Sequence, residues 1–241
     1  FYILALTTYE DEYFHKHPGV NPISLLKALY TNIKEKSIKR GGSTITMQVV
    51  RLSRNNPKRT IAEKIYEIIL ATRLELGLTK KEILLKYAAH APFGGNVVGL
   101  EAACWRYFQR PPSQLTVSEY AMLAVLPNNP ALIHPGRNRS ALKEKRNRLL
   151  DKLYQNGNLD SLSTYLAKLE ELPENPLTLP QVAPHVTNYF HQLSPGQRTT
   201  VSLDIDLQKR LLESSKRFQS ELIKNHVYNM GVVIGDVRSG R

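Results

Sequence analysis

The chain has 241 residues, with 33 lysines and arginines against 21 aspartates and glutamates, and therefore a net charge of +12. This length allows one large domain, or one domain and part of another, with a sizeable core. A basic chain favours an anionic partner: nucleic acid, a phospholipid surface or a phosphorylated substrate. The sequence has no zinc-finger spacing and no RNA-binding aromatic signature, so nucleic acid gains no support as the partner. The single cysteine, Cys104, excludes an internal disulfide.

Hydrophobic periodicity and capping residues predict a mainly α-helical chain, with residues 1–8 as a short buried strand or helix. Capping boxes are expected at Thr79 with Glu82 and at Thr116 with Glu119. The amphipathic segment 22–36 suits a membrane interface or an ordinary solvated face. The predicted helices cover residues 22–36, 43–52, 59–76, 79–87, 102–108, 116–126, 138–155, 160–170 and 204–225.

The composition changes near residue 171, where a proline-rich stretch begins. This stretch predicts a linker over 171–196, after a first domain over 1–170. Beyond it, residues 199–204 and 229–240 read as strands on either side of a helix, which predicts the start of a mixed α/β domain over 197–241. No segment is apolar enough to cross a membrane, and the chain begins without methionine, so an anchor is expected outside it.

The stretch from Arg40 to Arg51 reads RGGSTITMQVVR. Glycine tolerates the backbone angles of a loop whose N–H groups point one way, and Ser43 suits the N-cap of the helix that follows. With the hydroxyls of Ser43, Thr44 and Thr46 nearby, this loop is a candidate anion site. An ordinary glycine-rich turn before a surface helix is an equal alternative.

Carboxylates on two other elements are candidates for acid/base chemistry. Glu10 and Asp11 adjoin apolar Phe14, and desolvation of such a carboxylate raises its pKa and suits it to take a proton. A solvated acidic turn is the alternative. The helix over 59–76 looks apolar nearly all round and is expected to be buried, with Glu67 near Lys64. A buried glutamate is either used chemically or paired structurally with that lysine.

These stretches together resemble glycosyltransferase family 51, the peptidoglycan glycosyltransferase domain of class A penicillin-binding proteins. The family's motif Glu-Asp-x-x-Phe-x-x-His-x-Gly is met at Glu10, Asp11, Phe14, His17 and Gly19. The motif Gly-Gly-Ser-Thr-Ile-Thr-x-Gln is met at residues 41–46 and Gln48. Arg-Lys-x-x-Glu is met at Lys64 and Glu67, with Glu63 in place of arginine. Arg51 replaces a family lysine, Ala89 replaces an asparagine, and the loop over 89–99 is similar to the C-type branch.

The resemblance implies a lysozyme-like, mainly α domain that polymerises lipid II, followed by the start of a transpeptidase domain without its active site. Glu10 would be the general base on the acceptor's GlcNAc 4-hydroxyl, which attacks C1 of the donor's MurNAc with inversion. Glu67, the second catalytic residue, would help to stabilise the departing undecaprenyl pyrophosphate. The implied substrate-binding residues are Asp11, Phe14, His17, Arg40, Gly42, Ser43, Thr44, Thr46, Gln48, Arg51 and Lys64.

The implied partners are lipid II, the growing glycan chain, the membrane surface and other cell-wall synthesis proteins, with no nucleic acid, on the outer (periplasmic) face of the bacterial inner membrane. A divalent cation, Mg²⁺ or Mn²⁺, is a candidate companion of the pyrophosphate, although the sequence identifies no metal ligands. The Ser-x-x-Lys patterns at 24–27 and 140–143 are interpreted as structural. Two alternatives stay open: a lysozyme-like glycan hydrolase or lytic transglycosylase, and a non-catalytic cell-wall or membrane binding module.

Overall fold

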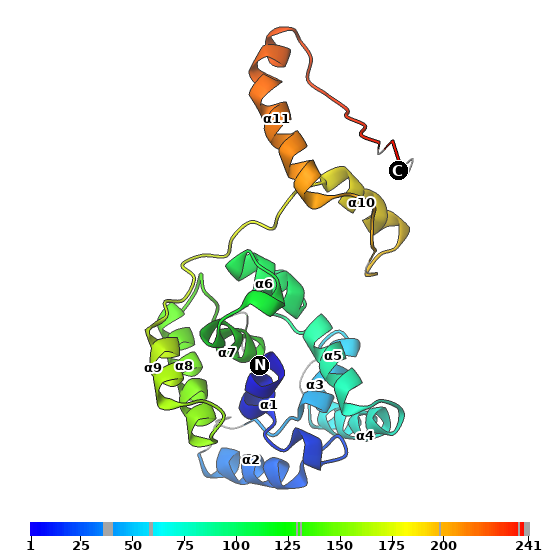
Figure 1. Cartoon of the computed structure of the whole chain (residues 1–241). Coiled ribbons are helices and arrows are strands. Elements are labelled where there is room, and N and C mark those ends of the chain that lie inside the picture. Colours follow the sequence, from blue (N-terminus) through cyan, green and yellow to red (C-terminus); the bar gives the residue numbers. More distant parts are fainter. Residues whose placement is uncertain are drawn as a thin grey trace. The chain divides into compact units, whose positions relative to one another are not determined.

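The structure is a computed structural model that describes residues 1–35, 41–57, 60–128, 130, 132–197, 199–235 and 237–238, except the side chains of residues 29, 32, 33 and 220. It confirms a mainly α-helical chain (Figure 1). The helices are α1 (Tyr2–Glu10), α2 (Pro22–Lys34), α3 (Ile45–Ser53), α4 (Ile61–Gly77), α5 (Lys80–His90), α6 (Leu100–Phe108), α7 (Val117–Val125), α8 (Arg139–Gln155), α9 (Ser161–Leu169), α10 (Pro184–Leu193) and α11 (Ile205–Lys224). The described residues also form three short 3₁₀ turns, η1 (Phe14–Lys16), η2 (Pro112–Gln114) and η3 (Leu126–Asn128).

The chain divides into two compact units, Phe1–Leu179 and Pro180–Arg241. In the first unit, α7 packs against both α1 and α8, and α3 packs against α4 and α5. Figure 1 shows α1 and α7 in the middle of this unit with the other helices around them. Apolar residues all round α7 are buried, from Ala121 to Val125, because neighbouring helices cover it on several sides.

Capping residues in the sequence locate the starts of α3, α5 and α7 to within one residue. The capping boxes at the starts of α5 and α7 are both present, so the predictions at Thr79 and Thr116 are confirmed. The N-cap of α3 is Thr44, so the prediction of Ser43 is wrong by one residue. Either hydroxyl could cap the helix, and Thr44 does so because its side chain also donates to the Gly19 carbonyl oxygen at 2.6 Å.

The exposure of α4 contradicts the prediction of a buried helix. Its apolar stripe faces solvent, with Ile61 84% and Leu76 87% exposed, and the buried side chains on the opposite side are Glu67 and Ala71. Periodicity locates an apolar stripe but does not say which way it faces. The apolar side chains of Ile23, Leu26 and Tyr30 on α2 are exposed in the same way.

The strands expected near the C-terminus do not form among the described residues of 199–204 and 229–235. A strand requires a partner that accepts its hydrogen bonds, and these segments meet none there. Isolated bridges join Pro92 to Val98 and His134 to Arg137 instead. The stretch expected as a linker contains a helix, α10, with Pro184 at its first position, where proline's missing N–H costs nothing. The assignment of 1–170 and 197–241 to separate domains stays a prediction.

The beginning of the proline-rich stretch is attached to the first unit. Arg106 and Leu177 exchange backbone and side-chain hydrogen bonds, and Gln109 donates to the carbonyl oxygen of Thr178 at 2.6 Å. The guanidinium of Arg146, which is fully buried, donates to the carbonyl oxygens of Lys168 and Glu170 at the end of α9. Across the described part of the chain, the helices are all too short or too polar to span a bilayer.

Candidate functional site

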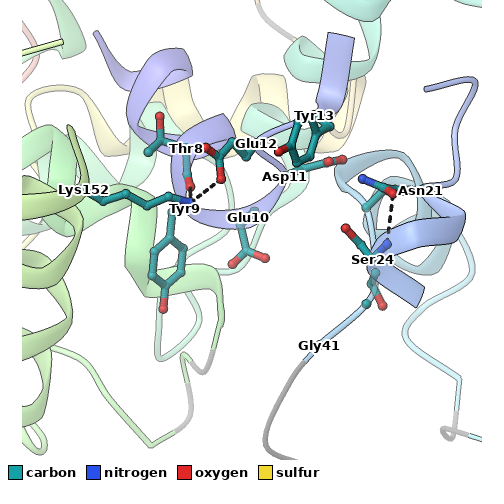
Figure 2. A pocket seen from close by; sticks show the side chains of 13 residues that line it. Thr8, Tyr9, Glu10, Asp11, Glu12, Tyr13, Asn21, Ser24, Gly41 and Lys152 are labelled. Atoms are coloured by element: carbon teal, nitrogen blue, oxygen red, sulfur yellow. Dashed lines mark hydrogen bonds and ion pairs between the residues drawn. The ribbon is translucent and has the colours of Figure 1, made fainter. Parts of the chain in front are cut away.

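A cleft of about 280 Å³ opens beside the end of α1, where Glu10 lies. Figure 2 shows the Glu10 carboxylate in the space between Tyr9 on one side and Asn21 with Ser24 on the other. The loop before α3 forms a further wall of the cleft, so the predicted base and the predicted anion loop share one cavity. The lining residues are Thr8, Tyr9, Glu10, Asp11, Glu12, Tyr13, Asn21, Ser24, Gly41, Gly42, Ser43, Thr44 and Lys152.

Glu10 is oriented by a glutamine on α3. Gln48 Nε2 donates to Glu10 Oε2 at 2.8 Å, and the hydroxyl of buried Tyr87 donates to Gln48 Oε1 at 3.4 Å. Because Tyr87 supplies a donor to the amide oxygen, the amide nitrogen is turned toward the carboxylate. The second carboxylate oxygen, Oε1, is buried and accepts no direct hydrogen bond from the described residues, although the side-chain amide of Asn128 is close enough to act on the carboxylate. The carboxylate therefore has acceptor capacity left for an incoming hydroxyl.

The electrostatic environment makes Glu10 a stronger base than an exposed glutamate. Burial raises the pKa of Glu10, while the amides of Gln48 and Asn128 and the ammonium of Lys145 lower it in part. Desolvation disfavours the charged carboxylate, which then gains more by taking a proton. A carboxylate with a raised pKa, hydrogen-bonded and placed in a cleft, has the properties of a general base.

Asp11 and His17 hold the loop between α1 and α2 against α3. His17 Nε2 lies 3.0 Å from both carboxylate oxygens of Asp11, and the backbone N–H of Ile45 donates to Asp11 Oδ2 at 3.1 Å. A carboxylate at the first turn of a helix is favoured by the helix dipole. Phe14, in the same loop, is fully buried in the core. The geometry of these three residues fits positioning, and a contact of theirs with substrate stays a prediction.

The N-terminus of α3 is already occupied by the protein's own groups. The N–H of Ile45 is bonded to Asp11, and the N–H of Met47 donates to Thr44 Oγ1 at 3.2 Å. An anion at this loop would therefore meet side-chain donors as well as any remaining backbone N–H groups. Gly42 lets the loop approach α2 closely, since a Cβ there would lie 3.1 Å from Ala28 Cβ.

Those side-chain donors form a cationic cluster around Ser43. Arg51 binds Glu67 through two hydrogen bonds, Nε to Oε1 at 2.6 Å and Nη2 to Oε2 at 2.7 Å. Lys64 Nζ lies 2.5 Å from Ser43 Oγ and 3.8 Å from Glu67 Oε2, and Arg51 Nη2 lies 3.4 Å from Ser43 Oγ. Ser43 lines the cleft, so both cations lie one contact away from it.

The two predicted catalytic carboxylates are connected through α3. Gln48, which contacts Glu10, and Arg51, which contacts Glu67, are three residues apart on this helix and so share a face. Glu67 does not line the cleft, and its side chain is only 5% exposed. Its geometry fits a carboxylate that orients Arg51 and Lys64. Direct participation of Glu67 in catalysis stays a prediction.

Thr46 and Arg40 complete the predicted set. Thr46 is fully buried and donates to Glu75 Oε1 at 2.6 Å, away from the cleft. Glu75 in turn binds Lys80, which also donates to the His17 carbonyl oxygen at 2.7 Å and lies 4.4 Å from the centre of the Phe14 ring. Arg40 lies outside the described residues.

Sequence reasoning missed two lysines on α8, of which Lys152 lines the cleft and Lys145 acts on Glu10. Lys152 on α8 donates to the carbonyl oxygen of Thr8 at 2.9 Å and pairs with Glu12 at 2.8 Å. Lys145, on the same helix, donates to Asn128 Oδ1 at 2.9 Å and acts electrostatically on Glu10. More than 100 residues separate each lysine from α1, and α8 reads as an ordinary charged helix, so no local signal marked them.

Comparisons with known proteins agree with the resemblance. The Transglycosylase family profile matches residues 1–154. Penicillin-binding protein 1C of Escherichia coli is 38% identical over 221 residues, which is 92% of this chain and 29% of that protein. Penicillin-binding protein 1A of Pseudomonas aeruginosa is 38% identical over 170 residues, 70% of this chain and 21% of that protein. Penicillin-binding protein 4 of Bacillus subtilis is 31% identical over 224 residues, 91% of this chain and 35% of that protein.

Proposed function

The chain belongs to the transglycosylase family, and from this premise we propose that it is a peptidoglycan glycosyltransferase that polymerises lipid II into glycan strands. The chain spans 29% of the length of the first of these relatives, so the relatives' names do not carry the activity by themselves. The observation that carries the proposal is the arrangement of the cleft. A carboxylate with raised pKa, Glu10, faces a loop whose Ser43 is bound by two cations.

In the proposed reaction, Glu10 takes the proton of the acceptor's GlcNAc 4-hydroxyl as that oxygen attacks C1 of the donor's MurNAc. The bond from C1 to the diphosphate oxygen breaks, the anomeric centre inverts, and undecaprenyl diphosphate leaves with the bonding electron pair. Gln48 holds the carboxylate with one oxygen engaged and acceptor capacity remaining. The amide N–H of Gln48 also stabilises the charged carboxylate of Glu10, which must be present before the proton is taken.

Negative charge develops on the departing diphosphate, and fixed cations near it stabilise that charge in the transition state. Arg51 and Lys64 are held by Glu67 and Ser43 before any ligand arrives, so little reorganisation is needed. This cluster favours a polymerase over a glycan hydrolase or lytic transglycosylase, whose leaving group is a neutral sugar. A non-catalytic binding module would use the same cations and is separated from the polymerase only by experiment.

A divalent cation with the diphosphate would find few protein ligands in this part of the site. Both oxygens of Glu67 are engaged by Arg51, and the described residues contain no group of three or more acidic, histidine or cysteine side chains able to hold an ion. These side chains do not fit a metal site held by the protein, and no step through a metal is derived. Activity measured with and without a chelator tests whether the diphosphate brings an ion with it.

The exposed apolar faces of α2 and α4 support the proposal that the domain works at a membrane surface, where the lipid tail of its substrate is held. The proposed location is the outer face of the bacterial inner membrane, with the growing glycan chain and other cell-wall synthesis proteins as partners. The second unit is proposed as the start of a transpeptidase domain, and the fold of the first unit as lysozyme-like.

The test is incubation of the protein with lipid II in detergent, with glycan chains separated by electrophoresis. Wild type should lengthen chains, and Glu10→Gln should lose at least about 100-fold in rate, the usual contribution of a general base. Glu144→Gln, which removes the acidic member of an exposed ion pair with Arg148 on α8, is the matched control and should polymerise at the wild-type rate. Cleavage of finished glycan without growth would replace the proposal by the hydrolase, and an unaffected Glu10→Gln would refute the assignment of the base.

A further inference from the structure

Two arginines at the end of α3 face two glutamates at the start of α4. Arg51 lies in the last turn of α3, and Arg54 is the C-cap residue that follows this helix. Glu63 and Glu67 are four residues apart on α4 and so share one side of it. Arg51 binds Glu67, and Arg54 binds Glu63 through Nη1 to Oε2 at 2.5 Å and Nη2 to Oε1 at 3.3 Å. Two ion pairs therefore join the helices beside the cationic cluster.

The two pairs differ in their access to solvent. The side chains of Arg51 and Glu67 are 14% and 5% exposed, whereas those of Arg54 and Glu63 are 31% and 29% exposed. The Arg54 guanidinium also lies over the ring of Tyr66, 4.4 Å from its centre. A dissolved anion can reach the outer pair far more easily than the inner one. The outer pair is therefore the one that a ligand can compete with.

The charges of the cluster largely cancel before a ligand binds. Among the described residues, the two ion pairs and Lys64 together hold three cations, Arg51, Arg54 and Lys64, and two carboxylates, Glu63 and Glu67, and Glu67 also acts electrostatically on Arg54. Glu63 stands where the family motif has arginine. A diphosphate approaching this cluster is attracted by Arg54 but repelled by the carboxylate that already holds it.

We propose that Glu63 is an internal counter-ion that weakens the binding of the departing lipid diphosphate by occupying Arg54, and that it thereby sets how readily this product leaves. The inference rests on the proposed function of the cleft. It makes Glu63 a residue that lowers affinity for the anionic leaving group. A purely structural ion pair would hold α3 against α4 and have no such effect on anion affinity.

The experiment measures the affinity of the whole chain for geranyl diphosphate by titration calorimetry at low and high salt. Glu63→Gln should bind the probe about three- to tenfold more tightly at low salt, with a smaller gain at high salt, because partly exposed charges are screened. Arg54→Gln leaves Glu63 without its partner and should bind more weakly. The double variant restores the net charge of the cluster and should return close to wild type. Glu171→Gln, which removes one charge from an exposed pair with Lys143, is the matched control and should leave affinity unchanged.

A structural role would give a different pattern. Glu63→Gln would then lower thermal stability and leave affinity unchanged or reduced, which overturns the inference. An equal gain for Glu171→Gln would show that net charge alone is responsible, and that also overturns it. Lys64→Gln separates this failure from that of the proposed function. If Lys64→Gln binds the probe as tightly as wild type, the diphosphate site is elsewhere and both proposals fail; if it binds more weakly while Glu63→Gln shows no gain, only the counter-ion inference fails.

Discussion

The loop that carries Asp11 and His17 passes so close to α4 that only glycine fits at one position. Gly19 has φ +87°, and a Cβ built on it would lie 2.6 Å from the carbonyl oxygen of Ala71 and 2.8 Å from its carbonyl carbon. Both are backbone atoms of a helix, so the contact cannot be relieved by rotating a side chain. The Gly19 carbonyl oxygen also accepts the hydrogen bond of Thr44, the N-cap of α3. Gly19→Ala should therefore disturb both stability and the site.

Substitutions at two other glycines separate the loss of stability in Gly19→Ala into backbone strain and steric clash. Gly157 has φ +71° with nothing within 4 Å of its Cβ position, so Gly157→Ala measures backbone strain alone, about 1–2 kcal/mol. Gly77, at the end of α4, has open space and no left-handed φ, so Gly77→Ala should be neutral or stabilising by up to about 1 kcal/mol. Gly19→Ala adds the clash to the strain and should cost about 2–4 kcal/mol.

The measurement is urea unfolding followed by the fluorescence of Trp105, the single tryptophan, which lies on α6 in the first unit. Lipid II polymerisation by the folded variant gives the second readout, and Gly19→Ala should be slower because the N-cap of α3 moves with the Gly19 carbonyl. If Gly19→Ala loses no more stability than Gly157→Ala, the close approach to Ala71 is not a constraint, and the account of this loop is wrong.

Three further outcomes follow from the contacts of the site. Gln48→Leu removes a donor that favours charged Glu10, so the acidic limb of the pH profile of kcat/KM should move to higher pH; no movement would contradict the orienting role of Gln48. Burial raises the pKa of Glu10 in the folded state. The stabilising contribution of its protonated carboxyl is therefore fully present below the unfolded pKa of about 4.5 and is lost as the pH rises through the folded pKa. Glu10→Gln should therefore raise the melting temperature relative to wild type at pH 7 and lose that advantage near pH 4, and an equal difference at both pH values would argue against a buried charge. Lys80→Met leaves the partly buried Glu75 with the hydrogen bond from Thr46 but without its cation and should cost about 1–3 kcal/mol in thermal unfolding, whereas Lys81→Met, one residue along the same helix, should change little.

Features that depend on neighbouring residues could be predicted from the sequence. The capping boxes at Thr79 and Thr116 need only a hydroxyl and a glutamate three residues later, and both formed. The motifs around Glu10 and Ser43 line one cleft, as the resemblance implied. Even so, the N-cap of α3 was misplaced, because the choice between Ser43 and Thr44 depends on the Gly19 carbonyl, 25 residues away from Thr44.

Features that depend on the rest of the fold could not be predicted from the sequence. The apolar stripe of α4 is equally compatible with a core and with an exposed surface, and only the packing of α3 on the opposite side decides between them. Extended segments near the C-terminus become strands only if a partner accepts their hydrogen bonds. The contacts of Tyr87 with Gln48 and of Lys152 with Glu12 join residues 39 or more positions apart, and nothing in either local pattern indicates them.

Two backbone N–H groups at the start of α3 already donate within the protein, which changes how the loop before this helix would bind an anion. Asp11 and Thr44 already accept hydrogen bonds from N–H groups of the first turn, so the proposed diphosphate would be held mainly by Arg51 and Lys64. Backbone N–H groups are the same in every sequence, whereas each side-chain cation can be strengthened or neutralised by one substitution nearby. Recognition through side chains therefore leaves anion affinity adjustable without rebuilding α3, and Glu63 beside Arg54 is one place where this chain can make that adjustment.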